Sequence, residues 1–320
     1  MNSFGRFFRI HLFGESHGAH IGVVIDGCRE GIGLLPDDFN PDLARRRSGA
    51  RGTTARHESD EPRIVSGLHN GYTTGAPLTI LFDNLDTRPG DYDLFRHTPR
   101  PGHADFAATQ KWHGFNDLRG SGHLSGRLTL ALVAAGVVAK KCIAPILVNA
   151  ALAEAGGSAN IAETVEQAMR DNDSVGGIVT CKAQHVPAGL GEPFFDAVES
   201  LLAHLLFAIP AVKGVEFGAG FAAAAMRGSQ HNDPLVSPDG TTATNHAGGI
   251  TGGITNGNDL AFRVAVKPTS SIAKPQQTLN LDTGRIETLE VHGRHDACIA
   301  LRVPVIVEAA TAIVLCDLLH

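Results

Sequence analysis

Short strand-like runs and helix-like runs occur together along this chain, separated by glycine-rich turns, and this mixture limits the folds that it can adopt. No linker, low-complexity tract or internal repeat interrupts the pattern, so we expect a single domain over residues 1–320. The sequence predicts an α/β or α+β fold. Apolar and β-branched residues predict strands at Ile21–Asp26, Arg63–Leu68, Leu78–Phe82, Gly176–Cys181, Gly214–Phe217 and Leu260–Val266.

Helices are predicted with similar frequency. Asn40 followed by Pro41 is typical of a helix cap and first turn, which predicts a helix that runs to Arg47. Three further helices are predicted by an Ala- and Leu-rich run or by apolar residues at helical spacing, over residues 125–142, 195–205 and 305–316.

Charge and cysteine usage exclude several classes of protein. The net charge of −6 argues against a nucleic-acid or membrane-surface partner. Charged residues interrupt the first 13 positions, which excludes a signal peptide there. The longest apolar stretch, Leu128–Ala139, is shorter than the roughly 20 residues that a membrane span requires. Five widely spaced cysteines indicate reduced thiols, so we expect a cytoplasmic protein.

Arginine is used far more than lysine among the 27 basic residues, mostly in the first half of the chain. A guanidinium group is a planar set of donors that fits phosphate and carboxylate groups. Because the net charge is not positive, this bias predicts specific anion sites rather than a basic surface. In Arg45-Arg46-Arg47, successive helical residues point about 100° apart, so we expect only one or two of the three to reach a site.

Three glycine-containing turns hold histidine or aspartate: residues 14–18 (GESHG), 100–105 (RPGHAD) and 293–296 (GRHD). Histidine titrates near neutral pH, so imidazole groups held in tight turns are natural general acids. Residues 247–257 (AGGITGGITNG) would let a flat ring or an anion approach the backbone. Residues 267–271 (KPTSS) place hydroxyl groups after a cation, which suits a phosphate or a ribityl chain.

Taken in this order, these blocks resemble the signature sequences of the chorismate synthase family. Residues 186–196 (VPAGLGEPFFD) and 209–218 (IPAVKGVEFG) add to the resemblance, which spans nearly the whole chain. The resemblance implies a β-α-β sandwich, a homotetramer and reduced FMN (FMNH2) as cofactor. It implies a lyase of the shikimate pathway that eliminates phosphate from 5-enolpyruvylshikimate 3-phosphate to give chorismate, for aromatic amino-acid biosynthesis. In that reaction the flavin lends an electron as phosphate leaves and recovers it as a proton is taken at flavin N(5).

The resemblance also implies roles for individual residues. His17 would be the acid toward the departing phosphate, His103 a proton donor or electrostatic partner at the flavin, and Asp296 the group that handles the proton at N(5). Arg46, Arg51, Arg100 and Arg127 would bind the substrate's phosphate and carboxylates. In some relatives the positions of Arg46 and Arg51 contact a reduced nicotinamide nucleotide (NADP type) instead. The implied flavin contacts are His123, Leu124, Ser125, Pro210, Ala211, Gly252, Lys267, Pro268, Thr269, Ser270, Ser271 and Arg294.

The chain departs from the family pattern at residues 119–129, where many members read RGGGRSSARET. His123 replaces an arginine, Leu124 a serine and Leu128 a glutamate. Imidazole cannot form the paired hydrogen bonds of guanidinium, so the flavin contact at His123 is expected to differ in detail.

Two alternatives stay open from the sequence. The spacing of His292, His295 and Asp296 also suits a metal-dependent phosphohydrolase, although no metal site is expected here. The second alternative is a non-catalytic flavin-binding relative of the family. Neither a GxGxxG motif after a strand nor a P-loop is present, so we expect an external NAD(P)H-dependent system, such as a separate flavin reductase, to reduce the flavin.

Overall fold

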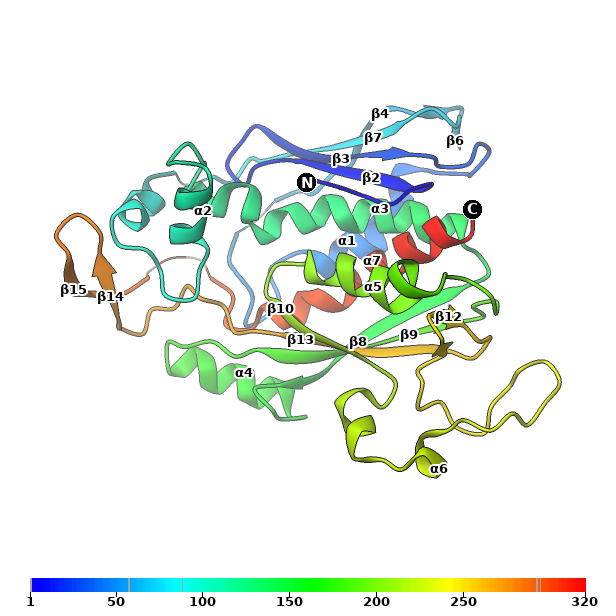
Figure 1. Ribbon diagram of the computed structural model, residues 1–320. Helices are drawn as coiled ribbons and strands as arrows, with labels where there is room; N and C mark the ends of the chain where they lie inside the picture. The colour runs from blue at the N-terminus through cyan, green and yellow to red at the C-terminus, as the bar shows by residue number, and fades with distance from the viewer. Residues whose placement is uncertain (1, 57, 88, 292, 294) are drawn as a thin grey trace.

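Two antiparallel sheets enclose a layer of helices in the computed structural model, which describes residues 2–56, 58–87, 89–291, 293 and 295–320 (Figure 1). The first sheet has the order β1-β2-β3-β7-β4 and the second the order β10-β13-β9-β8. The expected α+β class and the sandwich arrangement are confirmed. The strands of the first sheet are β1 (Ser3–Phe4), β2 (Arg9–Gly14), β3 (His20–Asp26), β7 (Leu78–Asp83) and β4 (Arg63–Ser66). Those of the second are β10 (Val212–Phe217), β13 (Leu260–Val266), β9 (Gly177–Gln184) and β8 (Leu147–Ala155).

Three two-stranded hairpins extend from these sheets, and the β14–β15 hairpin projects furthest from the body of the molecule (Figure 1). Their strands are β5 (Leu68–His69), β6 (Tyr72–Thr73), β11 (Ile250–Thr251), β12 (Ile254–Thr255), β14 (Gln276–Asn280) and β15 (Arg285–Leu289). The helices are α1 (Asn40–Arg46), α2 (Asp105–Lys111), α3 (Thr129–Cys142), α4 (Ile161–Arg170), α5 (Val198–Phe207), α6 (Gly228–His231) and α7 (Val303–Leu318). Single 3-10 turns are η1 (Pro36–Phe39), η2 (Pro89–Arg96), η3 (Arg119–Leu124), η4 (Gly126–Leu128), η5 (Phe194–Asp196), η6 (Gly220–Ala225) and η7 (Ile299–Arg302).

The helices α3 and α7 form the centre of the sandwich. Both are apolar on nearly all sides, which is typical of a helix that is covered all round. A Cβ atom at Gly136 would lie 2.3 Å from Cβ of Ala309, so glycine allows the two helices to approach closely. By length and composition, Arg119–Cys142 and Ile299–Leu318 could each cross a membrane, but 78% of each apolar window is buried inside the protein. They are therefore the core helices of this fold.

Glu308 is a charged residue in the middle of α7, and it connects four elements. Its carboxylate accepts two hydrogen bonds of 2.7 Å from Arg45 of α1, one of 2.9 Å from Lys140 of α3 and one of 2.9 Å from the backbone of Ala150 in β8. Burial would raise the pKa of Glu308, but the hydrogen bonds with Arg45 and the charge of Lys140 lower it. This network fixes α1 against the core and thereby fixes the neighbouring Arg46.

The predicted start of the first helix is wrong by one residue. Asn40 lies inside α1, and Phe39 is the cap, with helical backbone angles. The reason is that η1 leads directly into α1, so the chain is already helical where an Asn cap would need an extended conformation. The Asn40 side chain instead donates to the carboxylate of Asp37 at 3.2 Å.

Candidate functional site

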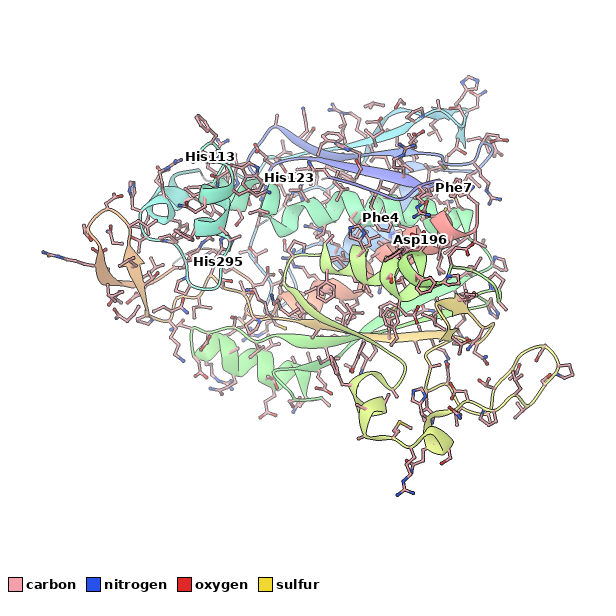
Figure 2. The ribbon with its side chains drawn as sticks, in the orientation of Figure 1. Phe4, Phe7, His113, His123, Asp196 and His295 are labelled. Carbon is pink, nitrogen blue, oxygen red and sulfur yellow. The ribbon has the colours of Figure 1, made fainter. Side chains whose placement is uncertain are left out.

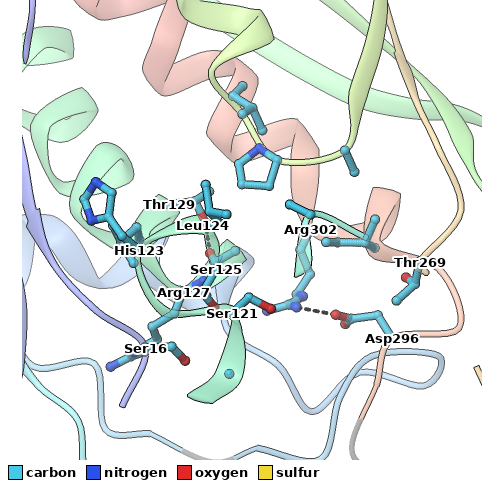
Figure 3. Close-up of a pocket in the computed structure, with 18 of the residues that line it drawn as sticks. Ser16, Ser121, His123, Leu124, Ser125, Arg127, Thr129, Thr269, Asp296 and Arg302 are labelled. Carbon is cyan, nitrogen blue, oxygen red and sulfur yellow. Dashed lines mark hydrogen bonds and ion pairs between the residues drawn. The ribbon is translucent and has the colours of Figure 1, made fainter. Parts of the chain in front are cut away.

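A cleft of about 800 Å³ lies where the three glycine-containing turns meet. Residues from these turns line it together with residues from η3, η4, the end of α5, the segment 267–271 and η7 (Figure 3). Its volume falls within the roughly 300–1,000 Å³ that is usual for small-molecule sites. Segments far apart in the sequence therefore converge on one hollow in the surface.

Most residues predicted for the site line this cleft. The exceptions are Arg51 and Gly252, while Arg294 lies outside the described residues. The predicted residues at the cleft are His17, His103, Asp296, Arg46, Arg100, Arg127, His123, Leu124, Ser125, Pro210, Ala211, Lys267, Pro268, Thr269, Ser270 and Ser271.

The structure places Arg51 and Gly252 elsewhere. Arg51 is largely exposed and forms an ion pair with Glu166 of α4, with 2.7 Å between the Arg51 Nη2 and Oε2 atoms. Gly252 lies in the turn between β11 and β12, next to the beginning of α5, whereas the cleft touches the end of α5. A ten-residue helix is about 15 Å long, so one helix length separates Gly252 from the cleft.

The turn that carries His17 is held by its neighbours. The backbone N–H of Ser16 donates to Gly122 at 3.0 Å. Arg56 donates to the hydroxyl of Ser16 at 2.9 Å and to its carbonyl oxygen at 3.1 Å, and Glu58 in turn accepts from Arg56. The His17 ring meets Tyr92 edge to face at 5.2 Å. These contacts fix the imidazole at the cleft wall.

His103 belongs to a buried group of charges. Its Nδ1 atom lies 2.7 Å from Asp105 Oδ1, and Arg100 also donates to Asp105 at 2.7 Å and 2.8 Å. Burial lowers the pKa of His103, and the charges of Arg100 and Lys267 act in the same direction, while Asp105 opposes them. The pKa of Asp105 is lowered because its bonds with Arg100 and His103 outweigh burial. His103 is therefore favoured in its neutral form.

Arg46 carries a positive charge that the protein compensates only in part. It is 4% exposed and donates to Thr129 at 3.2 Å and to the carbonyl of Gly126 at 2.9 Å, but its nearest carboxylate, Asp60, is 3.7 Å away. Burial first, and then repulsion by Arg302, lower the pKa of Arg46 to about 9. The guanidinium group stays protonated at neutral pH. An anion bound beside it would stabilise this charged form and so offset both its burial and its repulsion by Arg302.

The directions of the three consecutive arginines agree with the prediction. Arg45 points to Glu308 in the core, whereas Arg46 and Arg47 both line the cleft; Arg47 also donates to the carbonyl of Ser59 at 2.6 Å. Arg127 is engaged with the protein through all three of its guanidinium nitrogens, because it pairs with Asp60 and donates to Asn84 and to the carbonyl of Asp83.

Asp296 faces Arg302, a partner that the sequence did not indicate. Arg302 donates to one carboxylate oxygen at 2.6 Å, and the backbone N–H of Thr54 donates to the other at 3.0 Å (Figure 3). Within the described chain, the Nε atom of Arg302 is buried and has no hydrogen-bond partner. The hydroxyl of Thr269 shares this property, and both residues line the cleft. Arg47 Nε, in another residue of the cleft lining, is a third buried donor without a hydrogen-bond partner in the described chain.

His123 contacts the backbone and a side chain of the N-terminal part of the chain. Its Nδ1 atom donates to the carbonyl of Gly14 at 2.7 Å, and its Nε2 atom lies 3.1 Å from the side chain of Asn2. The ring stands at the start of the α3 segment beside the N-terminal strands (Figure 2). His123 therefore joins the N-terminus to the turn that carries His17.

Several cleft residues escaped the sequence analysis. They are Arg56, Glu58, Asp60, Ser121 and Arg302. Asp105, which contacts His103 but is not part of the cleft lining, lies within a predicted motif and had no predicted role. Among the described residues, no group of three or more His, Cys, Asp or Glu side chains is arranged to hold a metal ion. His292, a ligand of the metal alternative, lies outside the described residues.

Comparisons with known proteins agree with one another. The model of the chorismate synthase family matches residues 8–320. A chorismate synthase of Chitinophaga pinensis is 61% identical over 318 residues, 99% of this chain and 96% of the relative. One of Dehalococcoides mccartyi is 45% identical, with 99% and 96% covered. A crystal structure of chorismate synthase superimposes with a TM-score of 0.77 at 25% identity, covering 99% of this chain and 92% of the other. The phosphohydrolase and non-catalytic alternatives gain no support.

Proposed function

Since the chain belongs to the chorismate synthase family and is a lyase of that kind, we propose that its cleft binds reduced FMN beside 5-enolpyruvylshikimate 3-phosphate. The observation that carries the proposal is the convergence of His17, His103 and Asp296 on one cleft that is rich in cations. Elimination of phosphate requires stabilisation of the departing negative charge, and fixed donors supply it best in a site from which water is excluded.

The residues present fit a flavin phosphate and its polar side chain. Lys267 donates to the hydroxyl of Ser270 at 2.7 Å, and burial, followed by the charge of Lys213, lowers the pKa of Lys267. A bound anion would stabilise the charged form of Lys267 and so offset both its burial and its repulsion by Lys213. The unpartnered hydroxyl of Thr269 lies in the same segment. When bound, reduced FMN would lend an electron to the substrate as phosphate leaves.

Arg46, with its incompletely compensated charge, is the best candidate to bind the substrate's phosphate or a carboxylate. Arg100 and Arg127 are already paired with Asp105 and Asp60, so we propose that they contribute their remaining N–H groups and orient the site. The predicted role of Arg51 stays a prediction, since its guanidinium group pairs with Glu166.

His17 would give a proton to the departing phosphate. The proton that leaves the substrate ring would pass to flavin N(5), and Asp296 would accept it from there. Arg302 and the backbone of Thr54 hold the carboxylate of Asp296 in one orientation. His103, which is buried and favoured in its neutral form, would act as a polar partner of the flavin.

We propose further that residues 1–320 form one domain and that the enzyme is a cytoplasmic homotetramer that receives electrons from a separate NAD(P)H-dependent reductase. One hydrophobic core extends over both sheets, and the five cysteines are buried free thiols. Phe194, Phe195 and Phe221 are each more than 85% exposed, and self-association would cover such apolar surface. The predicted flavin contact of Gly252, remote from the cleft of its own chain, is likewise retained as a proposal.

Replacement of either His17 or Asp296 by alanine should lower the anaerobic rate of phosphate release, with dithionite-reduced FMN, by about 100-fold or more. The control is His69→Ala, which removes an exposed imidazole in the β5–β6 hairpin and should keep the wild-type rate. Full activity in His17→Ala or Asp296→Ala would remove that residue from its proposed role.

A further inference from the structure

Ser121 has a backbone conformation that serine rarely adopts. Its φ angle is 71°, in the left-handed region, and it lies between Gly120 and Gly122, whose φ angles are also positive. Glycine adopts this region freely, whereas a residue with a Cβ atom is strained in it. Strain of this kind persists where the surrounding structure requires the side chain, and it is concentrated at functional sites.

The side chain of Ser121 makes one contact that accounts for its presence. Its hydroxyl lies 3.0 Å from Nε2 of His103, at the wall of the cleft. On the other side of the ring, Nδ1 is 2.7 Å from Asp105 Oδ1 and 3.1 Å from a nitrogen of Arg100. Both ring nitrogens of His103 are therefore occupied by protein groups.

The directions of these hydrogen bonds follow from the groups involved. A carboxylate can only accept, so the short contact with Asp105 requires a proton on Nδ1. A nitrogen of Arg100 also lies 3.1 Å from Nδ1 and could only donate to it, but the 2.7 Å contact with Asp105 would be repulsive if Nδ1 carried no proton, so the shorter contact decides the tautomer. In the neutral ring Nε2 then has no proton and accepts from the hydroxyl of Ser121.

We propose that Ser121 is a positioning residue, which holds neutral His103 in the tautomer with its proton on Nδ1 and fixes the plane of the ring. The inference deepens the proposed function, because His103 is one of the three residues assigned to the chemistry. The charged groups that act on the ring are Arg100, Asp105 and Lys267, and none of them contacts Nε2 in the described chain.

Two variants separate the hydroxyl from the backbone strain. Ser121→Ala removes the hydroxyl and keeps the Cβ atom in the left-handed region, while Ser121→Gly removes both. A donor to Nε2 stabilises the neutral ring, so its loss should raise the titration midpoint of His103. A neutral hydrogen bond corresponds to a shift on the order of 0.5 to 1 pH unit.

The test is nitrogen NMR of the full-length protein with ¹⁵N-labelled histidine, recorded without flavin or substrate. The His103 signals are identified as those that disappear in His103→Gln. We expect the wild type to show a protonated Nδ1 and an unprotonated, hydrogen-bonded Nε2. Both Ser121 variants should raise the midpoint by the same amount, and Ser121→Gly should melt at a higher temperature than Ser121→Ala.

Unchanged His103 signals and midpoints in both variants would overturn the proposal, as would a wild-type ring protonated on Nε2. A change in Ser121→Ala alone would also overturn it, because the cause would then be the backbone. Since the spectra need no turnover, this outcome is independent of whether the proposed elimination is observed.

Discussion

Replacement of Gly120 by alanine should lower turnover by about 100-fold or more, because it pushes His17 away from its position at the cleft. The added Cβ atom would lie 2.5 Å from both Cε1 and Nδ1 of His17 and 2.5 Å from the hydroxyl of Ser16. Ser16 cannot move freely, since Arg56 and the backbone of Gly122 hold it, so the His17 ring must shift. The measurement is kcat/KM for phosphate release under anaerobic conditions with reduced FMN.

The matched control is Gly114→Ala. Gly114 also has a positive φ angle, of 80°, but a Cβ atom there would meet nothing within 4 Å. Both variants carry the strain of alanine in the left-handed region, roughly 1–2 kcal/mol, and Gly120→Ala adds the clash with His17 and Ser16. Only Gly120→Ala should lose activity. If the two variants turned over equally fast, the position of His17 would not matter for catalysis.

Replacement of Glu308 by alanine should destabilise the protein by about 2–4 kcal/mol. Loss of the carboxylate leaves the N–H of Ala150 without its acceptor and removes the main partner of Arg45, while Lys140 keeps its 2.7 Å contact with Asp42. Removal of one partner from a fully buried pair costs roughly 3–5 kcal/mol. The expected value is lower because 45% of the Arg45 side chain is exposed and can be rehydrated.

Denaturant unfolding measures this loss as a lower midpoint with an unchanged slope. Glu163→Ala is the control, since Glu163 lies on the exposed first turn of α4 and its loss should cost less than about 1 kcal/mol. An equal effect of the two substitutions would show that the Glu308 network does not stabilise the core.

Local patterns predicted the mixture of strands and helices, whereas the sandwich of layers was implied only by the resemblance to the family. Helix α3 is buried along nearly its whole length between the two sheets, and its apolar sequence is typical of such a helix. The start of α1 was mispredicted because the cap signal of Asn40 is local, while the preceding 3-10 turn that overrides it is not visible in the same motif.

The sequence predicted most of the residues that line the cleft but not the contacts between them. Three turns with similar composition indicated a common site, and the helical geometry of residues 45–47 correctly limited to two the arginines that reach it. The contacts of Ser121 with His103 and of Arg56 with Ser16 were not predictable, because each joins residues 18 or 40 positions apart. The one available sign of the left-handed backbone was that Ser121 stands where the family pattern has a glycine.

The central claim is that this cleft brings reduced flavin and the substrate together to eliminate phosphate. The most direct measurement is an anaerobic assay of the wild-type protein with 5-enolpyruvylshikimate 3-phosphate, with phosphate and chorismate quantified in parallel with reduced FMN, oxidised FMN or no flavin. We expect equal amounts of the two products, formed only with reduced FMN. Phosphate release without chorismate, or at the same rate with oxidised FMN or no flavin, would contradict the account.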